Sequence, residues 1–179
     1  MYRKSYLLNT GDQIPCIRLG TWQSKPGEVE KAVETALLAG YRHIDTATAY
    51  GNEAEVGAGI RASGVPRQEV FLTTKLHNQW HTRVMDSLDQ SLQKLNTTYV
   101  DLYLIHWPCA TDPNDLKKVV PDWDFVKTWR QMQQLPATGK VKNVGVSNFS
   151  ITHLEKLLND PSCEVRAHSK FSPNNSRNS

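Results

Sequence analysis

Short apolar runs alternate with helical hydrophobic patterns along most of the chain. Runs of β-branched and aromatic residues, each bounded by turn-forming residues, predict buried strands at 42–46, 70–75, 100–106 and 141–146, and a less regular run predicts one at 14–19. Helical spacing of apolar residues predicts four helices, carried by Val29, Val33, Ala36 and Leu37; by Val84, Leu88, Leu92 and Leu95; by Phe125, Trp129 and Met132; and by Ile151, Leu154, Leu157 and Leu158.

Residues that begin or end helices stand beside these stripes. Gly40 and Gly139 occupy positions typical of C-terminal caps after the first and third stripes. Ser150 stands where an N-cap belongs before the fourth stripe, and Pro161 follows that stripe and predicts its end.

Alternating strands and helices predict an α/β fold with a parallel sheet and right-handed crossovers. Asp45 and Lys75 are 30 positions apart and Lys75 and His106 are 31 apart, about the length of one strand–helix unit. An open doubly wound sheet and a closed eight-stranded barrel both fit. No strand is followed by a Gly-x-Gly-x-x-Gly turn, which favours the barrel. A barrel usually needs about 250 residues, so these 179 residues accommodate about five units.

Composition narrows the class of protein only slightly. Hydrophobic residues make up 39% and charged residues 22% of the chain, as in ordinary globular proteins, and no apolar run predicts a membrane span or a secretory signal. The net charge of +3 comes from scattered residues and does not indicate a nucleic-acid partner. Cys16, Cys109 and Cys163 match neither a zinc spacing nor a disulfide framework, which predicts a cytoplasmic protein.

Four chemically useful side chains are predicted at the carboxyl ends of strands. Asp45 closes the second strand, Lys75 the third and His106 the fourth, and Tyr50 lies five residues after Asp45. Catalytic groups of a parallel barrel project from these strand ends, so we expect the four side chains to meet at one rim.

Such a group suits protonation of an oxygen that is gaining negative charge. A tyrosine hydroxyl has an ordinary pKa near 10, and an ammonium beside it favours the phenolate. Lys75 is expected to supply that ammonium, Asp45 to hold Lys75, and His106 to donate a hydrogen bond to a substrate carbonyl. Reduction of a carbonyl by hydride is one reaction of this kind.

Each of these residues also has an ordinary interpretation. Asp45 alone is equally suited to cap a helix near Asn52. A lone lysine such as Lys75 is most often solvated, a lone tyrosine such as Tyr50 more often packs with its hydroxyl bonded, and His106 also fits a buried, hydrogen-bonded histidine.

A metal-dependent barrel hydrolase is a further alternative. His43 and Asp45 point to the same side of a strand, and His77, His81 and His106 are other possible ligands. The ammonium of Lys75 would oppose a cation among them, so we predict no metal site.

Four longer motifs resemble one family. They are residues 40–57 around Asp45 and Tyr50, Thr73-Thr-Lys-Leu76, Val100-Asp-Leu-Tyr-Leu-Ile-His-Trp-Pro108 and Gly139-Lys-Val-Lys-Asn-Val-Gly-Val-Ser-Asn-Phe149. In this order they resemble the aldo-keto reductases over roughly residues 5–164, and fungal members such as NADP-dependent glycerol dehydrogenases and aldehyde reductases in particular.

The resemblance implies a (β/α)8 TIM barrel that reduces small aldehydes or ketones with NADPH. It implies that Tyr50 is the general acid, that Lys75 and Asp45 tune it, and that His106 orients the substrate. It places the cofactor against Thr21, Trp22, Asp45, Ser147 and Asn148, and the substrate against Trp22, His77, His106 and Trp107. It says nothing of the oligomeric state.

The chain also departs from the family's pattern. Arg18 stands where glycine is usual, and this large cation is expected to crowd the first strand. His77 replaces a common pocket tryptophan, and the loop after Pro108 is short. The family's sixth strand does not follow Glu164; instead 164–179 is a polar Ser/Asn stretch, predicted to be a disordered tail after a partial barrel at 1–163.

Five strands cannot close an eight-stranded barrel, because strand number, tilt and shear are linked. We therefore expect this chain to be a truncated and inactive or barely stable reductase. The alternative is a non-catalytic regulatory or binding protein on the same fold.

Overall fold

A five-stranded parallel sheet forms the centre of the protein, whose computed structural model describes residues 4–164. Its strands are β3 (Leu19–Gly20), β4 (His43–Asp45), β5 (Phe71–Leu76), β6 (Val100–Ile105) and β9 (Val141–Val146). They lie side by side in chain order, and every neighbouring pair is parallel. A doubly wound sheet reverses its strand order, whereas a barrel does not, so the sheet is a sector of a barrel.

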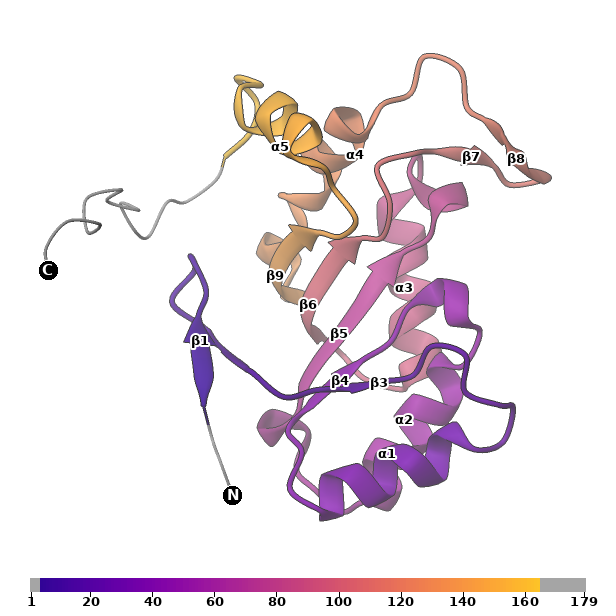
Figure 1. Ribbon diagram of the computed structural model, residues 1–179, viewed down its shortest axis with the longest axis vertical. Helices are drawn as coiled ribbons and strands as arrows, with labels where there is room; N and C mark the ends of the chain where they lie inside the picture. The colour runs from indigo at the N-terminus through magenta and orange to yellow at the C-terminus, as the bar shows by residue number, and fades with distance from the viewer. Residues whose placement is uncertain (1–3, 165–179) are drawn as a thin grey trace, which may run out of the picture.

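Five helices of the described residues lie between or after these strands along the chain. They are α1 (Val29–Leu38), α2 (Glu53–Ala62), α3 (Val84–Leu95), α4 (Phe125–Met132) and α5 (Ile151–Leu158). In Figure 1, α1, α2 and α3 lie on one side of the sheet, and the hairpin that contains β1 (Ser5–Leu7) lies on the other. Alternate strand residues such as Ile44, Leu72 and Tyr103 are fully buried in the hydrophobic core.

Short elements complete the described part of the chain. β1 pairs with β2 (Gln13–Pro15), and β7 (Thr111–Asp112) pairs with β8 (Asp115–Val119), both antiparallel. Four 3₁₀ helices are η1 (Thr48–Tyr50), η2 (Arg67–Glu69), η3 (Asn78–Trp80) and η4 (Leu135–Thr138).

Most predicted elements are confirmed, two are corrected, and one helix was not predicted. The run at 14–19 is not one strand, because Pro15 ends β2 and has no N–H with which to continue a ladder. The third predicted helix ends at Met132 and not at Gly139, because Pro136 lies in a separate turn, η4. Helix α2 was not predicted, since glycines interrupt its apolar stripe.

Helix α5 begins at its predicted cap but buries little of its predicted apolar side. The Ser150 hydroxyl accepts a hydrogen bond from the His153 N–H, as in a capping box. Only Leu157 of its stripe is buried, and Ile151 is 76% exposed. No helix in the described part of the chain is long and apolar enough to cross a membrane. The predicted polar tail lies, from residue 165 onward, outside the described residues.

Two glycines allow α2 to approach its neighbours closely. A Cβ added to Gly57 would lie 2.2 Å from the carbonyl oxygen of Leu95 in α3, and one added to Gly59 would lie 2.4 Å from that of Glu30 in α1. The backbone atoms they meet cannot rotate away, so these positions require glycine.

We predict that Gly57→Ala destabilises the protein by about 1–3 kcal/mol, because overpacking outweighs the gain of about 1 kcal/mol in helix propensity. Chemical denaturation followed by circular dichroism measures the change. Gly20→Ala is the matched control, since a Cβ at Gly20 meets no atom within 4 Å. Equal stabilities of the two variants would contradict the prediction.

Candidate active site

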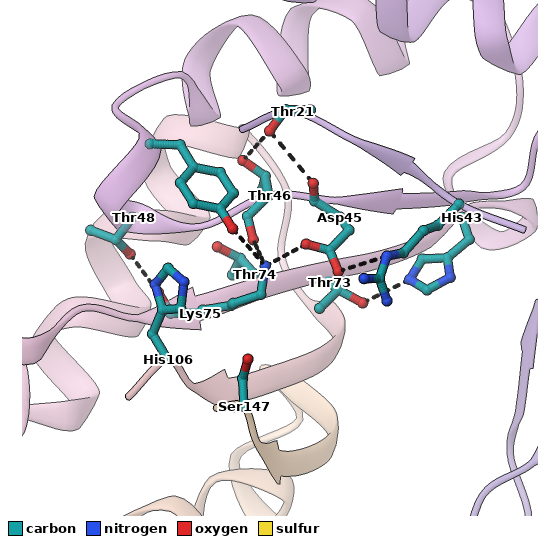
Figure 2. Close-up of polar contacts among 12 residues, drawn as sticks. Thr21, His43, Asp45, Thr46, Thr48, Thr73, Thr74, Lys75, His106 and Ser147 are labelled. Atoms are coloured by element: carbon teal, nitrogen blue, oxygen red, sulfur yellow. Dashed lines mark hydrogen bonds and ion pairs between the residues drawn. The ribbon is translucent and has the colours of Figure 1, made fainter. Parts of the chain in front are cut away.

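The four predicted side chains gather at the carboxyl edge of the sheet. Asp45 is the last residue of β4, Lys75 is the fifth of β5, and His106 directly follows β6. Tyr50 ends the 3₁₀ turn η1 after β4. Figure 2 shows the side chains of Asp45, Lys75 and His106 directed toward one region above the strand ends.

The buried Lys75 ammonium joins this group. Its Nζ donates to Asp45 Oδ1, to the Thr46 carbonyl oxygen at 2.8 Å and to the Tyr50 hydroxyl oxygen at 3.3 Å. An ammonium has three hydrogens, so all of its donors have acceptors. The Tyr50 oxygen accepts from Lys75, and its own hydrogen has no acceptor among residues 4–164. That hydrogen remains available to a ligand.

The His106 and Tyr50 rings make an edge-type contact, with centroids 5.6 Å apart at an interplanar angle of 77°. Trp107 stacks on the His106 ring, with centroids 6.3 Å apart at an interplanar angle of 28°. Burial, reinforced by the charges of Lys75 and His77, lowers the pKa of His106 to about 4, against a smaller opposing effect of Asp45. The imidazole is therefore neutral at pH 7, with one donor and one acceptor nitrogen.

Asp45 contacts two cations of unequal burial. Its Oδ1 accepts from Lys75, whose side chain is 7% exposed, and its Oδ2 lies 3.4 Å from Nε of Arg18, whose side chain is 62% exposed. Arg18 does not crowd the first strand, because Leu19 and Gly20 keep their pairing with β4. Asp45 is also not a helix cap; Asn52 precedes α2, and its side chain makes no cap bond.

A buried hydrogen-bond network holds one side of the Tyr50 turn. Thr21 Oγ1 donates to Thr46 Oγ1 at 3.0 Å, Thr46 Oγ1 donates to Asn52 Oδ1 at 3.2 Å, and Asn52 Nδ2 donates to the Thr21 carbonyl at 2.8 Å. Thr21 is thus buried behind the rim with its hydroxyl engaged. The sequence analysis did not single out Thr46 or Asn52, whose only signal was their place inside the motif at 40–57.

The remaining predicted residues lie around this rim. Asn148, at a φ of +60°, donates from Nδ2 to the His106 carbonyl at 2.9 Å and to Ser147 Oγ at 3.1 Å, which ties the end of β9 to that of β6. His77 follows β5 and is half-buried, and burial lowers its pKa. Trp22 and Trp107 are exposed.

The histidines do not form a metal site in the described part of the chain, where no three His, Cys, Asp or Glu side chains come together to hold an ion. His43 uses both ring nitrogens, toward Pro15 O at 3.1 Å and Thr73 Oγ1 at 3.0 Å. His81 Nδ1 contacts Thr128 Oγ1 at 3.0 Å. These two side chains therefore have structural partners.

Comparison with known proteins identifies the family. The model of the aldo/keto reductase family matches residues 16–174, and the chain belongs to that family. Glycerol 2-dehydrogenase (NADP(+)) from Saccharomyces cerevisiae is 53% identical, with 84% of this chain and 54% of the relative covered. D-galacturonate reductase from Hypocrea jecorina is 47% identical, with 88% and 56% covered.

A solved structure agrees with this assignment. The aldo-keto reductase of Bombyx mori in complex with NADP superimposes with a TM-score of 0.83 at 42% identity, covering 89% of this chain and 55% of that one. The predicted barrel class is confirmed. The chain spans about half the length of the curated relatives it matches.

We predict very different costs for removing the two cations of Asp45. Lys75→Met should destabilise the protein by about 3–5 kcal/mol, because it leaves a buried carboxylate without its buried partner. Arg18→Gly should cost about 0–1 kcal/mol, because solvent screens an exposed pair. Denaturant unfolding of both variants measures the costs. Similar costs would contradict this ranking.

We predict that folding stability falls as the pH drops from 6.5 to 4. Burial lowers the pKa of His81, like that of His106, from 6.5 to about 4, so the unfolded state binds more protons in this window. His81→Asn should reduce the loss by at most about 1.4 kcal/mol per pH unit. Denaturant unfolding at pH 5 and 7 measures this. Titration of both histidine NMR signals near pH 6.5 would contradict it.

Proposed function

We propose that the chain provides the proton-donating half of a reductase that converts aldehydes and ketones to alcohols with NADPH. The observation that carries this proposal is the hydrogen bond from Lys75 to the Tyr50 oxygen, which leaves the Tyr50 hydrogen free at the rim. Membership of the aldo-keto reductase family supports the reaction class.

Each of the four residues has a part in the proposed proton transfer. Tyr50 is the general acid and gives its hydroxyl proton to the carbonyl oxygen of the substrate. The Lys75 ammonium, held by Asp45, stabilises the phenolate that remains. The neutral His106 imidazole donates a hydrogen bond to the same carbonyl oxygen and orients it.

The end of β9 offers groups that suit the carboxamide of a nicotinamide. The Asn148 side-chain nitrogen is engaged with His106, which leaves its amide oxygen as an acceptor, and the Ser147 hydroxyl lies beside it. Thr21 and Asp45 support this region from within, and Trp22 stands at its mouth. When bound, the nicotinamide dinucleotide supplies the hydride. The NADP named for the yeast and silkworm relatives supports this cofactor.

The substrate is proposed to be a small carbonyl compound bound among the exposed Trp22 and Trp107 and the half-buried His77, next to His106. Relatives named for glycerol, galacturonate and glyceraldehyde support small polar substrates. We also propose a cytoplasmic location; its support is that the three described cysteines are free thiols.

We predict that Tyr50→Phe lowers the rate of aldehyde-dependent NADPH oxidation about 100-fold or more, because the phenyl ring packs alike but has no proton to give. The loss of NADPH absorbance with a panel of aldehydes measures the rate. The same substitution at Tyr6, an exposed tyrosine of β1, is the matched control and should keep the full rate. Equal rates above the background without protein for the unaltered chain and Tyr50→Phe would reject the proposed role.

A further inference from the structure

A buried carboxyl group lies behind the Tyr50 turn and takes no part in the proton transfer described above. Glu53 is the first residue of α2 and is 1% exposed. Its Oε1 accepts a hydrogen bond from Thr74 Oγ1 at 2.7 Å, and its Oε2 has no hydrogen-bond partner. None of the ion pairs formed within residues 4–164 includes Glu53.

This environment disfavours a carboxylate. Burying an ionised carboxyl group without a cation costs several kcal/mol, whereas a neutral acid avoids most of that cost. Burial raises the pKa of Glu53, and the Thr74 and Ser91 hydroxyls and the charge of Lys94 oppose this effect less strongly. A neutral acid also carries a hydrogen on one oxygen, and the unpartnered Oε2 is the atom with a place for it.

The hydroxyl groups nearby fix the direction in which hydrogens are donated. Thr48 Oγ1 donates its only hydrogen to the carbonyl oxygen of Lys75 at 3.1 Å. Thr48 Oγ1 also contacts Ser91 Oγ at 3.1 Å, and in this contact Ser91 must therefore be the donor. The Ser91 oxygen can then accept a hydrogen, and Ser91 is the second hydroxyl that acts on the Glu53 carboxyl.

We propose that Glu53 is kept as a neutral acid and acts as a positioning residue for the Tyr50–Lys75 pair. Its Oε1 accepts from Thr74, the residue before Lys75, while Ser91 donates to Thr48 and Thr48 donates to the backbone of Lys75. These hydrogen bonds fasten the turn that carries Tyr50, and the start of α2 directly after it, to the strand that carries Lys75. The catalytic meaning of the pair rests on the proposed function, but the protonation and the fastening do not.

Glutamine is the matched substitute for a neutral acid, because its amide accepts from Thr74 with oxygen and carries its hydrogens at the position of Oε2. Infrared difference spectra at pH 7 should show the C=O stretch of a protonated carboxylic acid that disappears in Glu53→Gln. The same substitution at Glu55, a half-buried carboxylate on the same helix that accepts from Gly27 and Val29 N–H groups, should leave that band in place. A spectrum without the band overturns the proposal.

The fastening is tested by NMR. Lys75 Nζ lies 5.0 Å from the centroid of the Tyr50 ring, so nuclear Overhauser effects between the two side chains report their contact. We expect the effects to persist in Glu53→Gln and to weaken at least twofold in Glu53→Ala and Thr48→Val. Thr48→Val keeps the side-chain shape, so it tests the hydrogen bonds that fasten the turn even if Glu53→Ala does not fold. Undiminished effects in Thr48→Val overturn the proposal.

The stability of Glu53→Gln relative to the unaltered chain gives a third test. A carboxyl group whose pKa is raised by folding binds more protons in the folded state than in the unfolded state. The unaltered protein therefore loses folding stability as the pH rises above the ordinary glutamate pKa of 4.5. The denaturation midpoint of Glu53→Gln should therefore rise relative to that of the unaltered chain between pH 5 and pH 8. A relative fall would show an ionised, stabilising carboxylate and overturn the proposal.

These measurements need neither cofactor nor turnover. A failure of the Tyr50→Phe experiment would reject the proposed function and leave the infrared, NMR and stability results standing. A failure of those results would reject the role of Glu53 and leave the reductase assignment untouched.

Discussion

The buried ammonium of Lys75 is the constraint on which this site depends. Moving an ammonium out of water costs several kcal/mol unless nearby acceptors replace the lost hydration. Here the acceptors are Asp45 Oδ1, the Thr46 carbonyl and the Tyr50 hydroxyl, which come from the end of β4, from the loop after it and from η1. The charge is therefore tolerated only when these three segments meet at β5. The same requirement brings the Tyr50 oxygen against a cation.

Two polar networks surround the turn that carries Tyr50. Thr21, Thr46 and Asn52 hold it on the side of β3, whereas the contacts of Thr48 with Ser91 and of Thr74 with Glu53 lie on the side of α2 and α3. Neither network touches the expected position of a substrate. Apart from Glu53, both consist of short side chains with few rotamers, so fixing them costs little conformational entropy. A hydroxyl aimed in this way can donate a proton without rearrangement of the chain.

The sheet described here has two outer strands, β3 and β9, and five strands in all. Closure of an eight-stranded barrel requires three more, and the matched relatives are nearly twice as long as the matched segment. Helix α5 follows β9 in the sequence, and its predicted apolar stripe is mostly exposed instead of buried in the core. A helix buries its stripe only against a neighbouring element, and the described residues provide one only for Leu157.

The sequence by itself determined the strand–helix alternation, four of the five sheet strands and the candidate residues Asp45, Tyr50, Lys75 and His106, because hydrophobic periodicity and strand ends are local properties. It could not show α2, whose stripe is interrupted by glycines that matter only through contacts with Leu95 and Glu30. Nor could it show that Thr21 is buried, that Arg18 reaches Asp45, or that one oxygen of the buried Glu53 has no hydrogen-bond partner. Those properties depend on distances between residues far apart in the chain, and only the packed structure sets them.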